Sequence, residues 1–204
     1  MKYRLLIALS VFLIKGYAQE NAPFDGHNYK APYFLDTPQH WGIERFPIPI
    51  QFAPSIAYKG VEDIRFTPGW AKKDSEEYWS YVFLWYLDGA VTMDVETIKK
   101  NLTAYYTGLM KANADPAKAA TISGAIVTVK KIVNNKKAEQ SFEAAVNTLD
   151  YMSWKPMQLN LRIHLLSCKE QNKTIVFHMV SPKAHNDAVW TTLIKFWDTL
   201  RCKK

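Results

Sequence analysis

YWSYVFLWYL, residues 78–87, contains six aromatic residues and no charged one, and it is bounded by Glu76-Glu77 and Asp88-Gly89. Successive side chains of a strand point to opposite sides, which would give this stretch two apolar faces. As a helix it would be apolar around its whole circumference, with no polar stripe. Its length and its aromatic content favour a strand. We therefore expect a strand that is covered on both faces, with Trp79, Tyr81, Phe83, Trp85 and Leu87 on one and Val82, Leu84 and Tyr86 on the other.

The chain begins with a basic segment (residues 1–4), an apolar run (residues 5–14) and small residues before Ala18. This pattern predicts a signal peptide at residues 1–18, and hence an exported protein, periplasmic or secreted. An uncleaved membrane anchor is the alternative, although the run is short for a bilayer, which takes about 20 residues. No later run reaches that length, so we expect no transmembrane segment after signal cleavage.

The apparent basicity of the chain is partly a property of this signal. The whole chain has a formal charge of +7, whereas residues 19–204 contain 23 basic and 19 acidic residues, a charge of +4. The basic residues are scattered in pairs such as Lys72-Lys73, whereas nucleic-acid binding needs a clustered patch, so we expect no nucleic-acid partner. The chain has no phosphate-binding glycine loop, zinc-protease motif, nucleophile elbow or C-x-x-C pair, and we expect no cofactor.

The remaining pattern predicts an irregular N-terminal arm, residues 19–46, and a single domain, residues 47–204. Seven of the ten prolines precede Trp70, and proline lacks the N–H group that a central strand needs. We expect an edge strand at 47–53, a strand at 61–66, and a helix that Asp94 caps and Asn113 ends. Alternating residues then predict an antiparallel meander at 125–133, 142–149, 158–166 and 174–180, followed by a helix at 187–200.

This order indicates an α+β fold in which helices cover an antiparallel β-sheet. It resembles the α/β/α sandwich of Mog1/PsbP-like domains over residues 47–202. The similarity in sequence is confined to the strand, loop and helix at Ile175–Leu200. The chain also resembles exported bacterial protein families without an assigned activity. The resemblance to Mog1/PsbP-like domains implies an accessory or binding module rather than an enzyme.

Two cysteines, Cys168 and Cys202, test this layout. An even pair in an exported protein is typical of a disulfide. Cys168 ends one strand, the next strand returns, and the last helix runs out again over a comparable length, which brings Cys202 back to the same end. We therefore expect a Cys168–Cys202 bridge. The alternative is two free thiols in a reducing compartment.

His164 and His178 form the best polar constellation in the sequence. If the turn between their strands centres on Gln171, the two imidazoles pair across the strands on one sheet face, about 5 Å apart at Cβ. Two histidines can hold a metal when a third ligand arrives, and His185 in the following loop is available. The alternative is a pair of partly buried histidines that are bonded to neighbouring groups.

Trp41, Trp70 and Trp154 are expected in loops, where aromatic rings can bind glycans or peptides by stacking. We assign ligand or partner binding to these tryptophans and to Arg162. Burial against the core is the alternative role. The carboxylates of Asp74, Glu77 and Asp88 are candidates for acid–base chemistry on a sugar, although their spacing in the sequence does not fix their separation in space. The alternative is a role in turns and helix caps.

These features predict an exported, non-enzymatic binding or accessory protein that recognises a protein or a small-molecule ligand. Two alternatives stay open. One is a metal-dependent or glycan-directed hydrolase that uses His164 and His178. The other is a carrier of a small apolar ligand held between the sheet and a helix.

Overall fold

The computed structural model describes residues 24–135 and 137–204. The predicted signal peptide, residues 1–18, and the first residues of the expected arm lie outside the described residues. Strands occupy 37% of the described residues and helices 21%. No helix in this part of the chain is both long enough and apolar enough to cross a membrane.

The elements follow one another in an order that is mostly strand. The strands are β1 (Tyr33–Phe34), β2 (Gly42–Ile48), β3 (Gly60–Phe66), β4 (Tyr81–Asp88), β5 (Ile126–Ile132), β6 (Gln140–Asp150), β7 (Lys155–Cys168), β8 (Lys173–Ser181) and β9 (Arg201–Cys202). The helices are α1 (Val95–Ala112), α2 (Pro116–Ala119) and α3 (Ala188–Thr199), with a short 3₁₀ turn, η1 (Lys169–Gln171).

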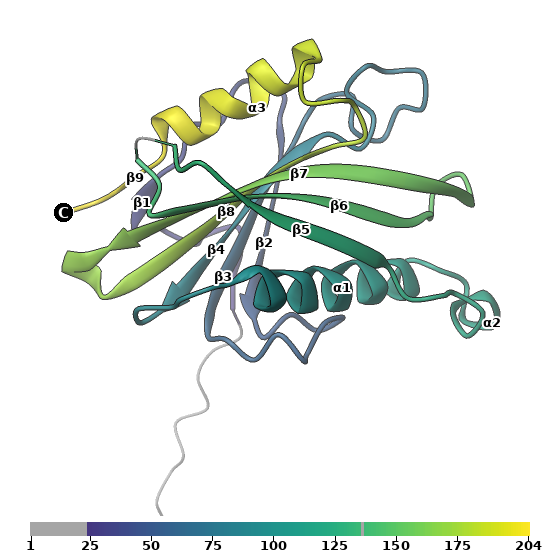
Figure 1. The fold of residues 1–204 in the computed structure, drawn as a ribbon, viewed down its shortest axis with the longest axis horizontal. Helices are drawn as coiled ribbons and strands as arrows, with labels where there is room; N and C mark the ends of the chain where they lie inside the picture. The colour runs from purple at the N-terminus through teal and green to yellow at the C-terminus, as the bar shows by residue number, and fades with distance from the viewer. Residues whose placement is uncertain (1–23, 136) are drawn as a thin grey trace, which may run out of the picture.

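Seven strands form one antiparallel sheet in the order β2-β3-β4-β8-β7-β6-β5 (Figure 1). The meander β5–β8 that the alternating residues predicted is confirmed. A second meander, β2–β4, joins it where β4 pairs with β8, with Tyr81 opposite Val180 and Leu87 opposite Thr174. Strands β1 and β9 form a separate two-stranded ribbon. The pairing of β4 with β8 therefore joins the two meanders into one sheet, although the paired strands are about ninety residues apart in the chain.

The two apolar faces expected for residues 78–87 are confirmed, although the strand starts at Tyr81. Residues Trp79, Tyr81, Phe83, Trp85 and Leu87 belong to the core beneath α1, and Val82, Leu84 and Tyr86 belong to the core beneath α3. Trp79 itself lies in the turn before β4 with a left-handed backbone, φ 53°. A bulky residue rarely adopts this conformation.

The expectation of a helix-covered α/β/α sandwich is wrong, because the structure is β-rich and each face of the sheet carries one long helix (Figure 1). Seven strands about 4.8 Å apart make a sheet almost 30 Å wide, whereas a helix with its side chains is about 10–12 Å across. One helix therefore leaves much of each face to loops and to the N-terminal arm. The number of long helices was expected correctly.

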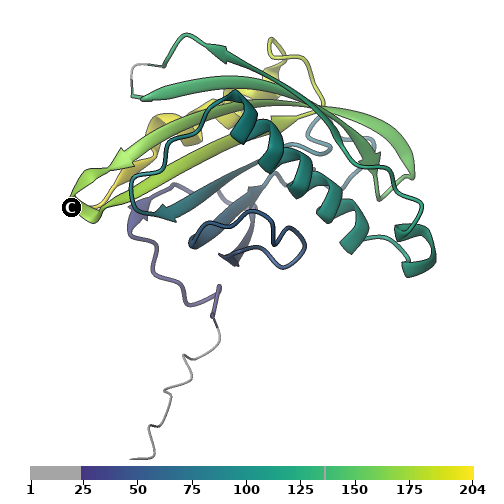
Figure 2. The ribbon, with the colours of Figure 1, turned by 60° about the horizontal axis from the view of Figure 1, so that its bottom comes forward.

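Both long helices begin as the sequence predicted. Asp94 accepts a hydrogen bond from the backbone N–H of Thr97 at 2.7 Å, and Asp187 accepts from Val189 at 3.1 Å. Such side-chain acceptors satisfy amide groups that have no partner inside the first turn. Asn113 ends α1, as expected. The two helices lie on opposite sides of the sheet, and Figure 2 shows α1 crossing its strands.

The edge strand β2 begins five residues before the position expected from the proline pattern and also spans the boundary expected at residue 46. Residues 49–59 form turns that pack on α1, where the rings of Phe52 and Tyr105 meet edge to face at 5.2 Å. Gly108 permits this approach, because a Cβ atom there would overlap the carbonyl oxygen of Phe52. The turns and α1 consequently pack against each other on one face of the sheet.

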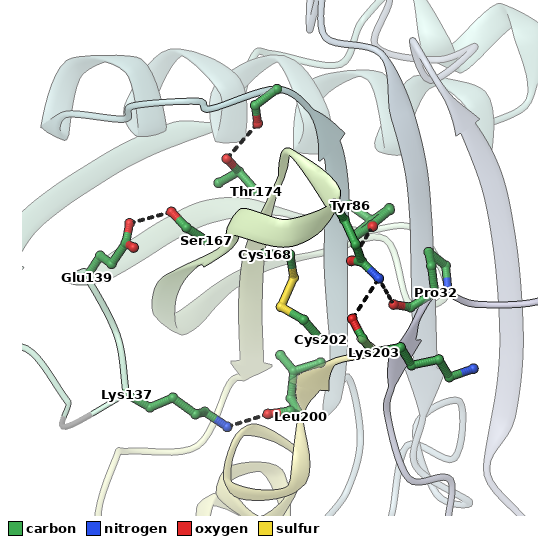
Figure 3. Close-up of a disulfide and its surroundings, with 12 residues drawn as sticks. Pro32, Tyr86, Lys137, Glu139, Ser167, Cys168, Thr174, Leu200, Cys202 and Lys203 are labelled. Atoms are coloured by element: carbon green, nitrogen blue, oxygen red, sulfur yellow. Dashed lines mark hydrogen bonds between the residues drawn. A yellow bond between two sulfur atoms is a disulfide. The ribbon is translucent and has the colours of Figure 1, made fainter.

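The Cys168–Cys202 disulfide is confirmed, with a Cα–Cα distance of 5.6 Å (Figure 3). It joins the end of β7 to β9, directly after α3. Beside it, the Gln171 side-chain amide donates to the carbonyl oxygens of Pro32 at 2.8 Å and Lys203 at 3.0 Å. The N-terminal arm, the 3₁₀ turn and the C-terminus are thereby tied together at one end of the sheet.

Candidate site: an aromatic cavity beside Glu62

The two histidines proposed as metal ligands lie on opposite faces of the sheet, so the expectation that they share one face is wrong. His164 pairs with Phe177, and His178 pairs with Ile163. The last pair of the hairpin is Cys168 with Lys173, so four residues form the turn and it does not centre on Gln171. A shift of one residue in register moves every side chain of a strand to the other face.

Each histidine is enclosed by aromatic rings. His178 stacks on Phe83 with ring centroids 4.0 Å apart, and its Nδ1 atom has no partner among the described residues. Burial lowers the pKa of His178 to about 3. His164 packs against Trp197, shares a 2.8 Å hydrogen bond with the hydroxyl of Ser141, and has its pKa lowered to about 4, chiefly by burial. Both imidazoles are therefore neutral parts of the two cores.

His185 and Arg162 meet instead at Glu143 on the α3 side of the sheet. The Oε1 atom of Glu143 lies 3.4 Å from His185 Nδ1 and 3.6 Å from Arg162 Nε. The guanidinium of Arg162 also lies over the ring of Trp190, 5.7 Å from its centroid. Within residues 24–135 and 137–204, no group of three or more His, Cys, Asp or Glu side chains is placed to hold a metal ion.

The three tryptophans assigned to loops have different surroundings. Trp41 packs on Phe196 of α3, with ring centroids 4.5 Å apart, and contributes to the core on that side. Trp154 is 39% exposed, and the ammonium group of Lys118 lies over its ring at 4.7 Å. Trp70 stacks on Phe66 at 4.4 Å and lines a cavity. Trp154 lines a shallow pocket beside β5 and β6, whereas Trp70 lines the more enclosed cavity between β2, β3, β4 and α1.

The carboxylates considered for acid–base chemistry do not all lie together, because Asp74 and Glu77 belong to the loop before β4 and Asp88 ends that strand. Glu77 accepts a 2.8 Å hydrogen bond from the backbone N–H of Gly69, which closes the loop before β4. Asp88 forms an ion pair with Lys173 at the opposite end of β4. Asp74 is exposed in the loop that contains Glu77. Glu77 and Asp88 thus have turn and pairing roles.

The cavity at Trp70 has a volume of about 570 Å³, which is within the range of small-molecule pockets. It lies between strands β2 to β4, the turn after β2, the C-terminal half of α1 and the residue after β6. Eight aromatic side chains contribute to its lining: Phe46, Phe52, Phe66, Trp70, Trp79, Tyr81, Tyr105 and Tyr151. Its charged lining residues are Glu44 and Glu62. The cavity occupies part of the sheet that the single helix α1 leaves to loops.

Strand register brings the polar and aromatic parts of the lining together. Phe46 of β2 lies directly opposite Glu62 of β3, and Glu44 lies opposite Ile64. These four side chains share the α1 face because they occupy alternate positions on paired strands. The next residues on β3, Asp63 and Arg65, face the other side. Glu62 is therefore the acid that the strand places behind the aromatic wall.

Glu62 is fully buried, and both oxygens of its carboxyl group are engaged. The indole N–H of Trp85 donates to Oε2 at 2.7 Å, and the hydroxyl of Tyr105 donates to Oε1 at 3.0 Å. Burial raises the pKa of Glu62 to about 7, while these two donors act in the opposite direction. The carboxyl group therefore changes charge near neutral pH, with Glu44 as a nearby acidic neighbour.

Asp150 at the end of β6 holds the cavity's far wall. Its carboxylate accepts from the indole N–H of Trp79 at 3.0 Å, the hydroxyl of Tyr78 at 2.6 Å and the backbone N–H of Met152 at 2.8 Å. Burial alone would raise the pKa of Asp150, but its hydrogen bonds outweigh burial and lower it. This ionised group fixes the turn that carries Trp79 against the turn that carries Tyr151.

Sequence reasoning selected Trp70 but missed Glu62, Glu44 and Asp150. A signal for Glu62 existed, because the segment Val61–Phe66 places three charged residues in a short strand next to the aromatic stretch. Charged groups in a covered strand are rarely buried unless they are paired. The pairing partners come from β4 and α1, and they could not be identified without the register.

Comparison of the chain with protein-family models, with curated proteins and with solved structures found no match. The resemblance to Mog1/PsbP-like domains therefore stays a prediction from the sequence. The candidate site accordingly rests on its own geometry.

Proposed function

We propose that this chain is an exported, non-enzymatic binding protein and that the aromatic cavity holds a small-molecule ligand. The observation that carries the proposal is a cavity of about 570 Å³ lined by eight aromatic rings and backed by one fully buried carboxyl group. Cavities of this size, mainly apolar with few polar groups, are the usual form of ligand sites. The proposal combines two predictions from the sequence. One is a binding function, and the other is a small ligand held between the sheet and a helix.

The polar groups of the lining favour binding over catalysis. Both oxygens of Glu62 accept hydrogen bonds from protein donors, and the hydroxyls of Tyr81 and Tyr106 bond to each other at 2.9 Å. Groups that are already paired orient a ligand through shape and charge, whereas a general base needs a free approach to its substrate. Export is supported by the signal pattern at residues 1–18 and by the Cys168–Cys202 disulfide.

A thermal-shift screen of residues 19–204 against organic amines, carboxylates, sugars and neutral aromatic compounds tests this function. A bound compound at a hundredfold excess over its dissociation constant stabilises the fold by about 2.7 kcal/mol. Ala112→Leu, in the last turn of α1, narrows the cavity and should abolish the shift. Ala188→Leu, at another exposed alanine in a helix, is the matched control and should keep the shift. A shift that survives Ala112→Leu, or a panel that produces none, would refute the cavity as the ligand site.

A further inference from the structure

We propose that the ligand of the aromatic cavity carries a positive charge, as an ammonium or a similar organic cation. This inference rests on the proposed function, since it names the chemical class that the same cavity would bind. It follows from the sign of the charges in the lining, from the aromatic rings, and from the position of Glu44 on the edge strand.

The charged residues that line the cavity, within the part of the chain that the structure describes, are all acidic. They are Glu44 and Glu62, and no lysine, arginine or histidine accompanies them. This composition runs against that of the chain, which has 26 basic and 19 acidic residues. An anionic ligand would meet like charge here, whereas a cation would meet opposite charge.

Aromatic rings provide the second part of the argument. The face of an aromatic ring carries partial negative charge and attracts a cation within about 6 Å of its centroid. Phe46 is 37% exposed on β2, and Trp70 and Tyr151 are half-buried. Rings from three separate segments therefore surround the same space. Multiple aromatic faces are the usual surroundings of quaternary ammonium groups in proteins.

Glu44 extends the negative potential to these rings. Burial raises the pKa of Tyr151, and the charges of Glu44 and Asp150 raise it further. The pKa of Tyr105 is raised by burial first, then by charged neighbours that include Glu62 and Glu44. Glu62 lines the cavity but is fully buried, and both of its carboxyl oxygens are bonded to protein donors, so it acts on a ligand through its charge rather than by direct contact. Glu44 is exposed and is the carboxylate available to a bound cation.

A neutral apolar ligand fits the same space less well. It would cover Glu44 and take water from its carboxylate without supplying a partner, which is unfavourable for an ionised group. A cation of the same shape replaces that water with opposite charge. A cation and a neutral compound of the same shape differ only in charge. Comparing their binding therefore tests the role of charge directly.

Isothermal titration of residues 19–204 with choline, and with its neutral carbon isostere in which carbon replaces the ammonium nitrogen, tests the inference. At low ionic strength we expect choline to bind at least about tenfold more tightly than the isostere. Glu44→Gln should weaken choline binding about threefold to tenfold, and it should leave the isostere bound as tightly or more tightly, because the desolvated side chain is then uncharged. Glu170→Gln, the same change at an exposed position in the 3₁₀ turn, controls for net charge and should have no effect.

The outcomes separate the two proposals. Equal or tighter binding of the isostere would overturn the cationic ligand and leave the cavity as a ligand site. Choline binding that is unchanged in Glu44→Gln would also overturn it. If neither compound binds, the cationic ligand is again refuted, and the compound panel with Ala112→Leu then decides independently whether the cavity binds any ligand.

Discussion

Glu62→Gln should remove a pH dependence of folding that the buried carboxyl group imposes on the wild-type protein. The folded-state pKa of Glu62 is raised to about 7 from an ordinary value of 4.5. Between these values the folded protein holds a proton that the unfolded chain has released. The resulting contribution to stability is present below the unfolded pKa and is lost as pH rises through the folded pKa. Two and a half pKa units correspond to about 3 kcal/mol.

The difference between the two proteins isolates this contribution. His164 and His178 have depressed pKa values, so their contributions to stability rise with pH over the range from about 3 to 6.5. Wild type and Glu62→Gln both retain these histidines, so the effect of the histidines cancels in the difference between the two free energies of unfolding. Glutamine keeps the shape of Glu62, and its amide can accept from the indole of Trp85 and donate to the hydroxyl oxygen of Tyr105. Any cost of that exchange is constant with pH.

Urea denaturation followed by tryptophan fluorescence at pH 5, 6, 7 and 8 provides the measurement. We expect the free energy of unfolding of wild type, relative to Glu62→Gln, to fall by about 2.5 kcal/mol between pH 5 and pH 8, most of it before pH 7, because part of the full loss already occurs below pH 5. Glu44→Gln should leave most of the fall in place, because Glu44 is exposed. A difference that is constant within about 0.5 kcal/mol, or one that rises with pH, would contradict a proton held at Glu62.

Two further predictions concern the scaffold of the site. Replacing Cys168 and Cys202 by alanine opens a loop of 34 residues and should lower the free energy of unfolding by about 4 kcal/mol, whereas a loss below about 1 kcal/mol in urea would argue against the bridge. Reductant should destabilise the wild type and have no effect on this double variant. Gly108→Ala should destabilise by about 1–3 kcal/mol despite the better helix propensity of alanine, because its Cβ atom would displace the Phe52 carbonyl, and an increased Tm would contradict this packing.

Local features of the sequence predicted most of the elements. Helix α1 starts at its predicted cap, Asp94, helix α3 starts within one residue of its predicted position, and the alternating strands β5–β8 pair as a meander. These features depend on residues that are close in the chain, so their periodicity and caps can be identified without a fold. The disulfide was also predicted, because strand and helix lengths alone bring Cys168 and Cys202 to one end of the sheet.

The candidate site was much less predictable. The expectation that His164 and His178 share one sheet face was wrong by a single residue of register in the turn before Lys173. A hairpin's register depends on the exact length and type of its turn, and here that turn is a 3₁₀ segment. Trp70 was selected for its ring and its loop, but its role beside Glu62 depends on contacts between β3, β4 and α1.

The sequence by itself determined that residues 78–87 need apolar cover on two sides, since neither of their faces carries a charge. Only the tertiary structure decided what provides that cover. One helix lies on each face of the sheet. On the α1 face, the turn after β2 adds to the cover, and it can approach the helix because Gly108 has no Cβ atom. The space that remains there is the aromatic cavity. Its charge depends on Glu62 and Glu44, and their position follows from strand pairing, a contact between distant segments that no local pattern encodes.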